Sequence, residues 1–388
     1  MRVLIAPDSF KGTVGAPEVA AALSRGWLRA RPADTVVLQP MADGGEGSLD
    51  VLASTTPGSL RRFVRVLGPG GPVMAPWLLC PDGTAFVELA AASGLPLLKE
   101  LDPMQAHTHG FGELLAAAAK HPDVRKIVAA LGGSASTDGG TGALTALGAK
   151  FCGPGRSRIP LGGVHLTDLA RIDTSRLIAP PGQGVEVLVD VDAPLVGPDG
   201  AAHQFAAQKG ADAAQIDELE AGLLHYAHVV GHPVGNPGSG AAGGTAYGLV
   251  ALWGARLSPG VEAIARRVRL DDLVSDVDLV VTGEGRLDRQ SFQGKVVGHV
   301  TSTGARFGLP VWACVGQQTG DAPQLAGTVQ LARMAGSVEA AMADPGMWLE
   351  NAGERLAALA ASDTAVTTDS SQSAGPAAPR TTSTLESA

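Results

Sequence analysis

The stretch VLIAPDSFKGT (residues 3–13) decides the fold class. Its first four residues form a continuous apolar run, which is typical of a strand buried in a parallel sheet. A turn that carries Asp8 and Lys11 follows, and a helix is expected from about Pro17 to Arg29. The stretch therefore predicts a strand–turn–helix unit with charged side chains at the carboxyl end of its strand.

The same order recurs along the chain. Short apolar runs at residues 36–39, 127–131 and 279–281 each lead into a glycine-rich turn, and a further run at 311–315 ends at Gly316. Repeated units of this kind predict an α/β fold whose parallel sheet, Rossmann-like or flavodoxin-like, is covered by helices on both faces.

Two regions break this pattern and predict a second, inserted α/β domain. Residues 60–100 form short alternating pieces split by Pro-Gly turns, which predicts a β-rich, partly antiparallel region. Residues 151–255 mix a Pro/Gly-rich stretch with a strand at 185–191 and a helix near 212–229. We therefore assign 1–58, 107–150 and 256–362 to a discontinuous Rossmann-like parallel domain, 59–106 and 151–255 to a second mixed α/β domain, and 363–388 to a tail.

Composition narrows the class of protein. The chain has 388 residues, with 29 Lys plus Arg against 38 Asp plus Glu, so a formal charge of −9 argues against an electrostatic nucleic-acid binder. Its three cysteines form no pair motif, which fits a reducing compartment. No apolar stretch reaches the length of a membrane span, so we expect a cytoplasmic protein that binds neither membrane nor nucleic acid. The tail from about Ser362 has no aromatic residue and no Ile or Met, which predicts disorder.

Acidic residues lie in or beside the turns after five predicted strands. Ligands of open α/β sheets bind at the carboxyl ends of strands, where backbone N–H groups can bind an anion. Mg²⁺ is bound by one or two carboxylates together with phosphate oxygens and waters. Single acids of this kind are more often turn formers or helix caps. The whole set nevertheless predicts a phosphoryl-transfer site, and its members are Asp8, Asp43, Glu46, Asp138, Asp190, Asp192, Glu284 and Asp288.

Two lysines can supply positive charge to such a site. Lys11 and Lys295 each adjoin a glycine, and a lysine in a glycine-rich turn commonly binds phosphate. Familiar single motifs fail, because a Walker A motif ending at Lys295 would need Ser or Thr where Val296 stands. Residues 238–243 match a dinucleotide fingerprint, but no strand is expected before them.

Taken together, the turns resemble those of the bacterial type I glycerate kinases, of the glycerate 2-kinase type. The resemblance runs in order from about residue 1 to 345. It is carried by PDSFKG (7–12), ADGGEG (42–47), GGSA (132–135) with DGG (138–140), PGSGAAGG (237–244), and TGEGRLD (282–288) with Gly294-Lys295.

The resemblance implies a kinase that uses ATP with Mg²⁺ to phosphorylate D-glycerate to 2-phosphoglycerate in a cleft between two α/β domains. We expect a monomer or a homodimer. On this basis we assign hypothetical roles. They are catalysis for Asp190, Lys11 and Lys295; substrate binding for Asp8, Ser9, Lys11 and Arg286; nucleotide binding for Gly132, Gly133, Ser134, Gly283, Glu284 and Gly285; and metal binding for Asp43, Glu46 and Asp192.

Three alternatives stay open at this point. Thr137, Ala193 and Val296 depart from the pattern usual in the family, which leaves room for a related small hydroxy acid as substrate. Asp190-Val191-Asp192 after a strand also resembles the nucleophile of aspartyl-phosphate phosphatases and phosphotransferases, although Pro194 stands where they usually have Thr. A non-catalytic nucleotide or sugar-acid sensor is the third reading, but binding alone seldom needs so many desolvated carboxylates.

Overall fold

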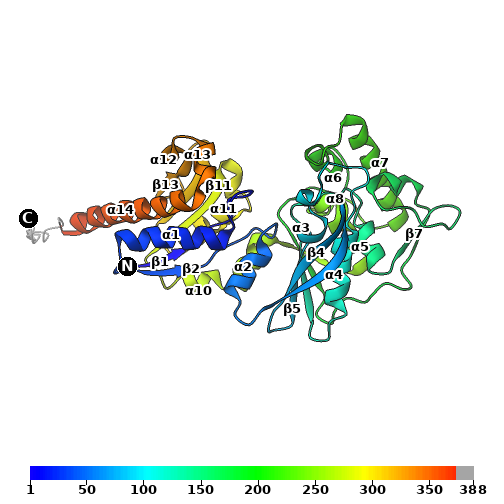
Figure 1. The fold of residues 1–388 in the computed structure, drawn as a ribbon, viewed down its shortest axis with the longest axis horizontal. Helices are drawn as coiled ribbons and strands as arrows, with labels where there is room; N and C mark the ends of the chain where they lie inside the picture. Colours follow the sequence, from blue (N-terminus) through cyan, green and yellow to red (C-terminus); the bar gives the residue numbers. More distant parts are fainter. Residues whose placement is uncertain (373–388) are drawn as a thin grey trace, which may run out of the picture.

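The computed structural model describes residues 1–372, of which 362–372 are described by their backbone alone. Two large sheets lie toward opposite ends of the long axis of the molecule (Figure 1). The two ends of the chain build one sheet and the middle of the chain builds the other, so the first part is discontinuous in sequence.

The first sheet has five parallel strands in the order β13-β12-β11-β1-β2. Val3 and Ile5 of β1 face one core, and Leu4 faces the other, as the two-residue period of a strand requires. Both faces are therefore apolar. The strands are β1 (Arg2–Ile5), β2 (Thr35–Leu38), β11 (Leu279–Leu287), β12 (Val311–Gln318) and β13 (Gly327–Gln330).

Helices cover both faces of this sheet. On one face α1 packs along α14 (Figure 1). Trp27 and Leu356 are buried on that face. The helices of that face are α1 (Ala16–Ala30), α12 (Leu331–Ala335), α13 (Val338–Ala343) and α14 (Pro345–Gln372). The opposite face is covered by α9 (Gly260–Arg267), α10 (Leu270–Val274) and α11 (Val296–Arg306).

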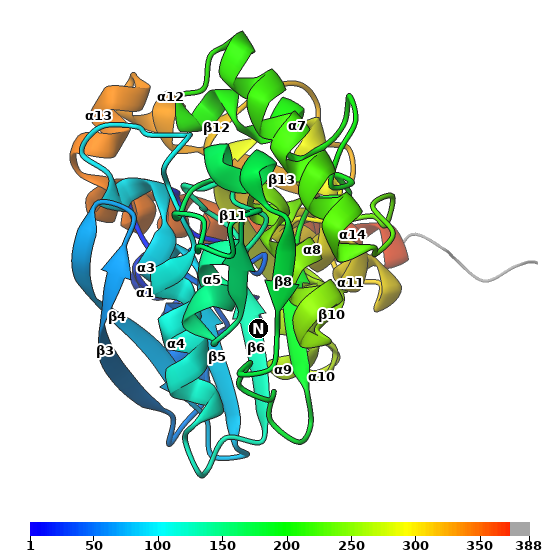
Figure 2. The ribbon, with the colours of Figure 1, turned by 90° about the vertical axis from the view of Figure 1, so that its right-hand side faces the viewer.

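The second sheet has six strands in the order β10-β9-β6-β5-β4-β3 (Figure 2). The strands β3, β4 and β5 pair antiparallel, as residues 60–100 predict, whereas β5, β6, β9 and β10 run parallel. The bounds are β3 (Leu60–Gly68), β4 (Gly71–Leu79), β5 (Thr84–Glu88), β6 (Lys126–Ala130), β9 (Val185–Val189) and β10 (Arg256–Pro259).

One face of this second sheet belongs to its own core, which includes Phe111, Leu223 and Tyr247. The helices around it are α3 (Ala90–Ser93), α4 (His109–Ala119), α5 (Thr141–Ala146), α6 (Ala201–Phe205), α7 (Ala213–Val230) and α8 (Ala241–Trp253). Short 3₁₀ turns are η1 (Leu95–Leu97), η2 (Gly163–Asp168), η3 (Ala207–Lys209) and η4 (Arg289–Phe292). A small antiparallel pair, β7 (Lys150–Cys152) and β8 (Arg171–Asp173), lies at the edge.

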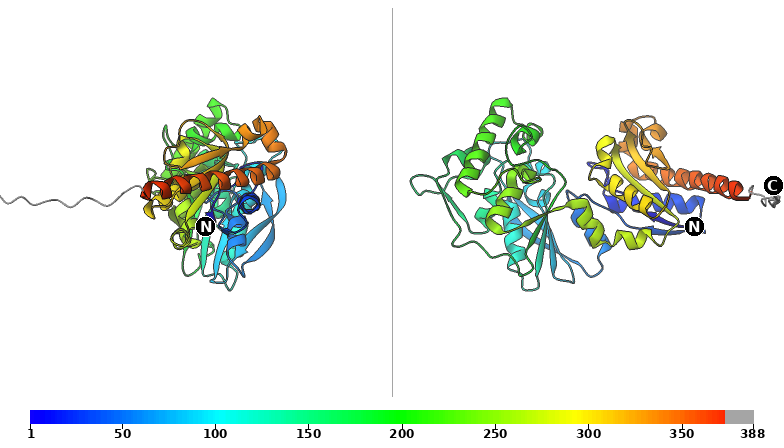
Figure 3. Two further views of the ribbon diagram at one scale, coloured as in Figure 1. Left: turned by 90° about the vertical axis from the view of Figure 1, so that its left-hand side faces the viewer. Right: turned by 180° about the vertical axis from the view of Figure 1, so that it is seen from behind.

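The other face of the second sheet joins the first part of the molecule. Phe86, Val128 and Leu188 share one apolar cluster with Leu52 of α2 (Ser48–Thr55) and Ile264 of α9. The two helices therefore lie between the sheets, as the view from behind shows (Figure 3, right). This shared core fixes how the carboxyl ends of the two sets of strands are placed.

Two placements differ from the sequence analysis. Residues 107–150 were assigned to the first sheet, but β6 pairs with β5 and β9 in the second, and β10 pairs there as well. The reason is that a parallel strand–turn–helix unit has the same pattern in either sheet. The helix α14 continues to Gln372, past the expected start of the tail at 363, and the rest of that tail, 373–388, lies outside the described residues.

The first sheet has a switch point between β1 and β11. From β1 the chain passes through α1 to β2 on one side, and from β11 it passes through α11 to β12 on the other. Crevices at such a point, outside the carboxyl ends of the strands, are the usual ligand sites of open α/β sheets. Within residues 1–372, no helix combines the length and the apolar character needed to cross a membrane.

Candidate active site

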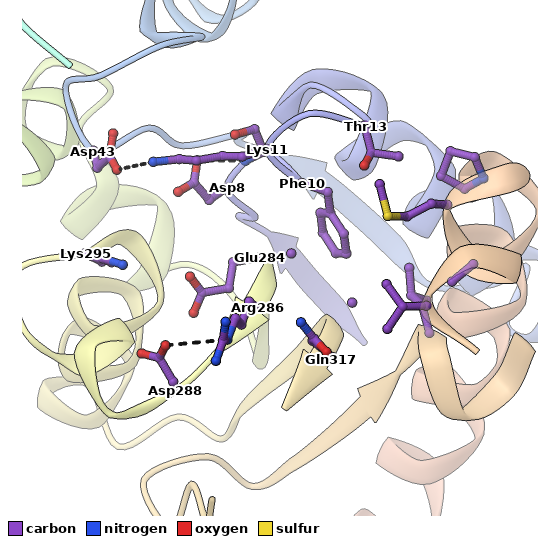
Figure 4. Close-up of a pocket in the computed structure, with 18 residues that line it drawn as sticks. Asp8, Phe10, Lys11, Thr13, Asp43, Glu284, Arg286, Asp288, Lys295 and Gln317 are labelled. Carbon is purple, nitrogen blue, oxygen red and sulfur yellow. Dashed lines mark hydrogen bonds and ion pairs between the residues drawn. The ribbon is translucent and has the colours of Figure 1, made fainter. Parts of the chain in front are cut away.

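A first cavity, of about 340 Å³, lies at the switch point between β1 and β11 (Figure 4). Its charged end holds Asp8 and Lys11 after β1, Asp43 after β2, and Glu284 in β11. Its other end is apolar. That end is lined by Phe10, Leu331, Val338, Ala341, Met342 and Pro345.

Lys11 forms an ion pair with Asp43 at the charged end of the first cavity. Its Nζ donates a hydrogen bond to Asp43 Oδ2 at 3.1 Å, and Asp43 Oδ1 accepts from the Gly45 N–H at 2.9 Å. The charge of Asp43 is the main cause that raises the pKa of Lys11 above its usual value. Gly260 allows this arrangement, because a Cβ at that position would lie 1.9 Å from the Asp43 carbonyl oxygen.

Several carboxylates are crowded and poorly solvated here. Burial, and then the charge of Asp43, raise the pKa of Asp8 to about 7. Burial also raises the pKa of Glu284, whose Oε1 has no hydrogen-bond partner in the described part of the chain. Asp8, Asp43 and Glu284 therefore form a cluster of negative charge that Lys11 and Lys295 partly offset. A divalent cation would relieve it.

A second cavity, of about 320 Å³, lies at the carboxyl ends of β6 and β9 in the other sheet. The turn Gly132–Ser134 and Asp190 form part of its wall. Lys209, at the end of η3, and Ala242, at the start of α8, complete it. Ala242 has a φ of 53°, a left-handed conformation that is strained for a residue with a Cβ.

The second cavity comes close to the first at Asp190. Although its side chain is exposed, the surrounding walls desolvate it, and this effect followed by the charge of Asp43 raises its pKa. The positive charges of Lys11 and Lys295 act in the opposite direction. Gly45 and Gly132 also approach closely, so the turn after β2 touches the turn after β6. Loops of both sheets thus border one crevice.

The structure brings most of the predicted residues to these two cavities. The first takes Asp8, Ser9, Lys11, Asp43, Glu284, Gly285, Arg286 and Lys295, and the second takes Gly132, Gly133, Ser134 and Asp190.

Four predicted residues line neither cavity. Gly283 lies within β11, and its carbonyl accepts the Asp8 N–H at 2.8 Å. Glu46 and Asp192 are exposed. Asp43, Glu46 and Asp192, the three predicted metal ligands, therefore do not lie together, since only Asp43 lines a cavity. Asp138 has a structural role, because its buried carboxylate accepts from Thr108 and from the N–H groups of Gly140 and Gly142.

Two groups of site residues were missed by the sequence analysis. Lys209 adjoins Gly210, which is the same signal that singles out Lys11 and Lys295, yet it was not considered. The apolar wall made by Leu331, Val338 and Met342 carries no sequence signal, because apolar residues in short helices are ordinarily core.

The buried carboxyl of Asp8 predicts a pH-dependent effect on stability. The Asp8 pKa is about 7 in the folded protein and near 3.8 in the unfolded chain, so the folded form binds the extra proton between these values. Raising the pH from 5 to 8 therefore costs stability. We expect Asp8→Asn to raise Tm at pH 8 by about 2 °C or more, and by clearly less at pH 5, in scanning calorimetry with EDTA. An equal shift at both pH values would contradict this explanation.

The comparisons with known proteins agree with this architecture. The model of the glycerate kinase family matches residues 3–361. A glycerate 2-kinase of Escherichia coli K12 is 41% identical over 331 residues, covering 83% of this chain and 86% of that protein. A glycerate kinase of Halalkalibacterium halodurans is 41% identical over 325 residues, covering 81% and 85%.

A solved structure resembles the whole arrangement. The crystal structure of a protein described as glycerate kinase 2, from Salmonella typhimurium LT2, superimposes with a TM-score of 0.80 at 34% identity and covers 94% of this chain and 99% of that one. Sequence match and fold therefore lead to one conclusion: this chain belongs to the glycerate kinase family.

Proposed function

We propose that the protein transfers the γ-phosphoryl group of ATP to the C2 hydroxyl of D-glycerate, giving 2-phosphoglycerate. The observation that carries this proposal is the closeness of two cavities. The charges of Asp43, Lys11 and Lys295, which line the first cavity, act on Asp190 in the wall of the second. Family membership supports the glycerate substrate. We assign the nucleotide to the first cavity and the acceptor to the second.

The first cavity suits the nucleotide. Phe10, Met342 and their apolar neighbours offer a slot for a purine base, and Lys11, Arg286 and Lys295 lie at the end where a polyphosphate would extend. Ligand pockets commonly combine an apolar wall with a few polar groups in this way. This placement reassigns Lys11 and Arg286 from the glycerate carboxylate to phosphate.

The second cavity suits the acceptor. Gly132–Ser134 and Asp190 form part of its wall, so we assign this glycine turn to the acceptor rather than to the nucleotide. We infer that an Asp190 oxygen accepts the proton of the C2 hydroxyl. Its raised pKa brings it nearer the working pH, which favours a general base.

The charged end of the first cavity fits Mg²⁺. The fit rests on Glu284 Oε1, which is buried without a partner, and on Asp8 and Asp43 beside it. Within residues 1–372, no group of three His, Cys, Asp or Glu side chains is placed so that it could hold a metal ion by itself. Mg²⁺ does not require one, because it is commonly held by one or two carboxylates with phosphate oxygens and water. When bound it would neutralise phosphate charge, and Asp43 and Glu284 would hold it.

The chain's own residues account for the rest of the transfer. The C2 oxygen forms a bond to the γ-phosphorus while the bond from that phosphorus to the β–γ bridging oxygen breaks, and ADP leaves. The proton of the C2 hydroxyl passes to Asp190. Lys11 and Lys295 offset the charge on the transferring group, so catalysis rests mainly on alignment and electrostatic stabilisation.

A coupled assay tests the proposed function. We expect ADP to form from ATP when D-glycerate and Mg²⁺ are present, with phosphorus NMR showing the product phosphate on C2. L-glycerate and other small hydroxy acids serve as comparison substrates. A stable phosphoprotein formed without ATP, or ADP formation equal with and without any acceptor, would contradict the proposal.

A further inference from the structure

Lys209 is a buried cation that has no role in the phosphoryl transfer proposed here. Lys209 is 3% exposed, although it carries the charge of an ammonium group. Its Nζ donates to Ser134 Oγ at 3.1 Å and to the Ser136 carbonyl at 2.5 Å. An ammonium has three N–H groups, and two of them are satisfied here. No carboxylate forms an ion pair with Lys209 among residues 1–372.

Burial of this charge has a cost that a structural role does not explain. Removing an ammonium from water costs several kcal/mol unless a counter-charge is present. Burial accordingly lowers the pKa of Lys209 to about 8, and only the charge of Asp138 acts in the opposite direction. Asp138 is already saturated by Thr108 and two backbone N–H groups. Buried lysines of this kind are typical of functional sites.

Lys209 is positioned to bind a ligand. It lines the second cavity together with Gly132–Ser134 and Asp190. The opposing wall is the start of α8, where Ala242, Gly243 and Gly244 have left-handed backbone conformations in succession. Gly243 passes so close to Ser136 that a Cβ there would lie 2.2 Å from the Ser136 carbonyl oxygen. The backbone around Lys209 is therefore tightly constrained on more than one side.

We infer that Lys209 binds the carboxylate of the hydroxy-acid acceptor, an inference that rests on the proposed function. In a 2-hydroxy acid the carboxylate and the hydroxyl group are attached to the same carbon. An acceptor held by Lys209 at its carboxylate therefore has its hydroxyl in the cavity that Asp190 also lines. The phosphates of the nucleotide have Lys11, Arg286 and Lys295 in the first cavity and do not need Lys209.

This arrangement makes Lys209 a determinant of specificity. An acid supplies the missing counter-charge to the ammonium, whereas a neutral polyol such as glycerol leaves the buried charge uncompensated. A site built for a charged partner rejects analogues that lack it. We therefore expect discrimination between acid and polyol to depend on this side chain.

The test compares Lys209→Met with Lys209→Arg and with Lys120→Met, a control at an exposed lysine. We expect Lys209→Met to raise KM for D-glycerate about 10- to 100-fold with KM for ATP nearly unchanged, because a hydrogen bond to a charged group is lost. Lys120→Met should behave as the wild type. Thermal stabilisation of the protein by D-glycerate alone, without ATP, should also disappear in Lys209→Met.

The pH dependence of kcat/KM distinguishes a role of Lys209 in binding the acceptor from a purely structural role. In the wild type, kcat/KM for D-glycerate should fall as the pH rises through about 8, because the ammonium loses its proton. Lys209→Arg keeps its charge and should not show that fall.

Three outcomes would decide against the inference. The first is a KM for D-glycerate within twofold of the wild type in Lys209→Met. The second is an equal rise in both KM values. The third is a pH profile that is the same in wild type and Lys209→Arg, and this applies even if Lys209→Met does not fold. A wild type that fails to phosphorylate glycerate would instead overturn the proposed function.

Discussion

Asp190→Asn is expected to lower kcat by about 100-fold or more, with KM for ATP little changed. The carboxylate stands directly after β9 in the wall of the second cavity, and its raised pKa reflects desolvation together with the charge of Asp43. Asparagine keeps the shape of the side chain but cannot accept the proton of the acceptor hydroxyl. Steady-state kinetics with D-glycerate and ATP measure the effect.

Asp192→Asn provides the matched comparison. Asp192 lies two residues further on, is exposed and lines neither cavity, so we expect a loss below about tenfold. If both variants lost activity equally, the metal role that the sequence suggests for Asp192 would be favoured. Wild-type turnover in Asp190→Asn would remove Asp190 from the role of base.

Gly26→Ala is expected to cause the largest loss of stability. In α1, Gly26 faces α14, and a Cβ there would lie 1.8 Å from the Glu350 carbonyl oxygen and 2.9 Å from the Glu354 nitrogen. Both contacts are to backbone, so the two helices must separate. Overpacking of this kind costs about 1–3 kcal/mol, and more where backbone cannot yield. Urea unfolding should show a clearly lower midpoint.

Gly346→Ala is the control within α14. A Cβ at Gly346 meets nothing within 4 Å, so alanine should be neutral or stabilise the helix by up to about 1 kcal/mol. If Gly26→Ala and Gly346→Ala unfolded at the same urea concentration, the close approach of α1 and α14 would not matter for stability.

The sequence predicts which turns carry the site residues, but not which sheet the preceding strands join. Asp8, Asp43, Asp190 and Glu284 follow or end apolar runs, and the chemistry of strand ends is visible in such a pattern. The sheet to which a run belongs is not visible, because β6 and β9 have the same apolar character as β1 and β11. This is why residues 107–150 were assigned to the wrong sheet.

The apolar wall of the first cavity and the buried Lys209 could not be predicted for a different reason. Met342 and Val338 lie in α13, far along the chain from Phe10, and only tertiary packing makes them one wall. Lys209 had a sequence signal in the adjacent Gly210, but its burial depends on the folded loop from Ser134 to Ser136. Long-range packing, rather than local pattern, determines both.

The pairing of β1 with β11 has a consequence for biosynthesis. Val3 pairs with Leu279, so the first strand emerges from the ribosome long before its neighbour exists. At roughly 5–20 residues per second, the delay is on the order of tens of seconds. During that interval the strands β3 to β10 can already assemble, whereas β1 has only β2 to pair with and α1 lacks α14 to pack against. The nascent amino-terminal segment is thus a natural client for chaperones that shield exposed apolar chain until translation is complete.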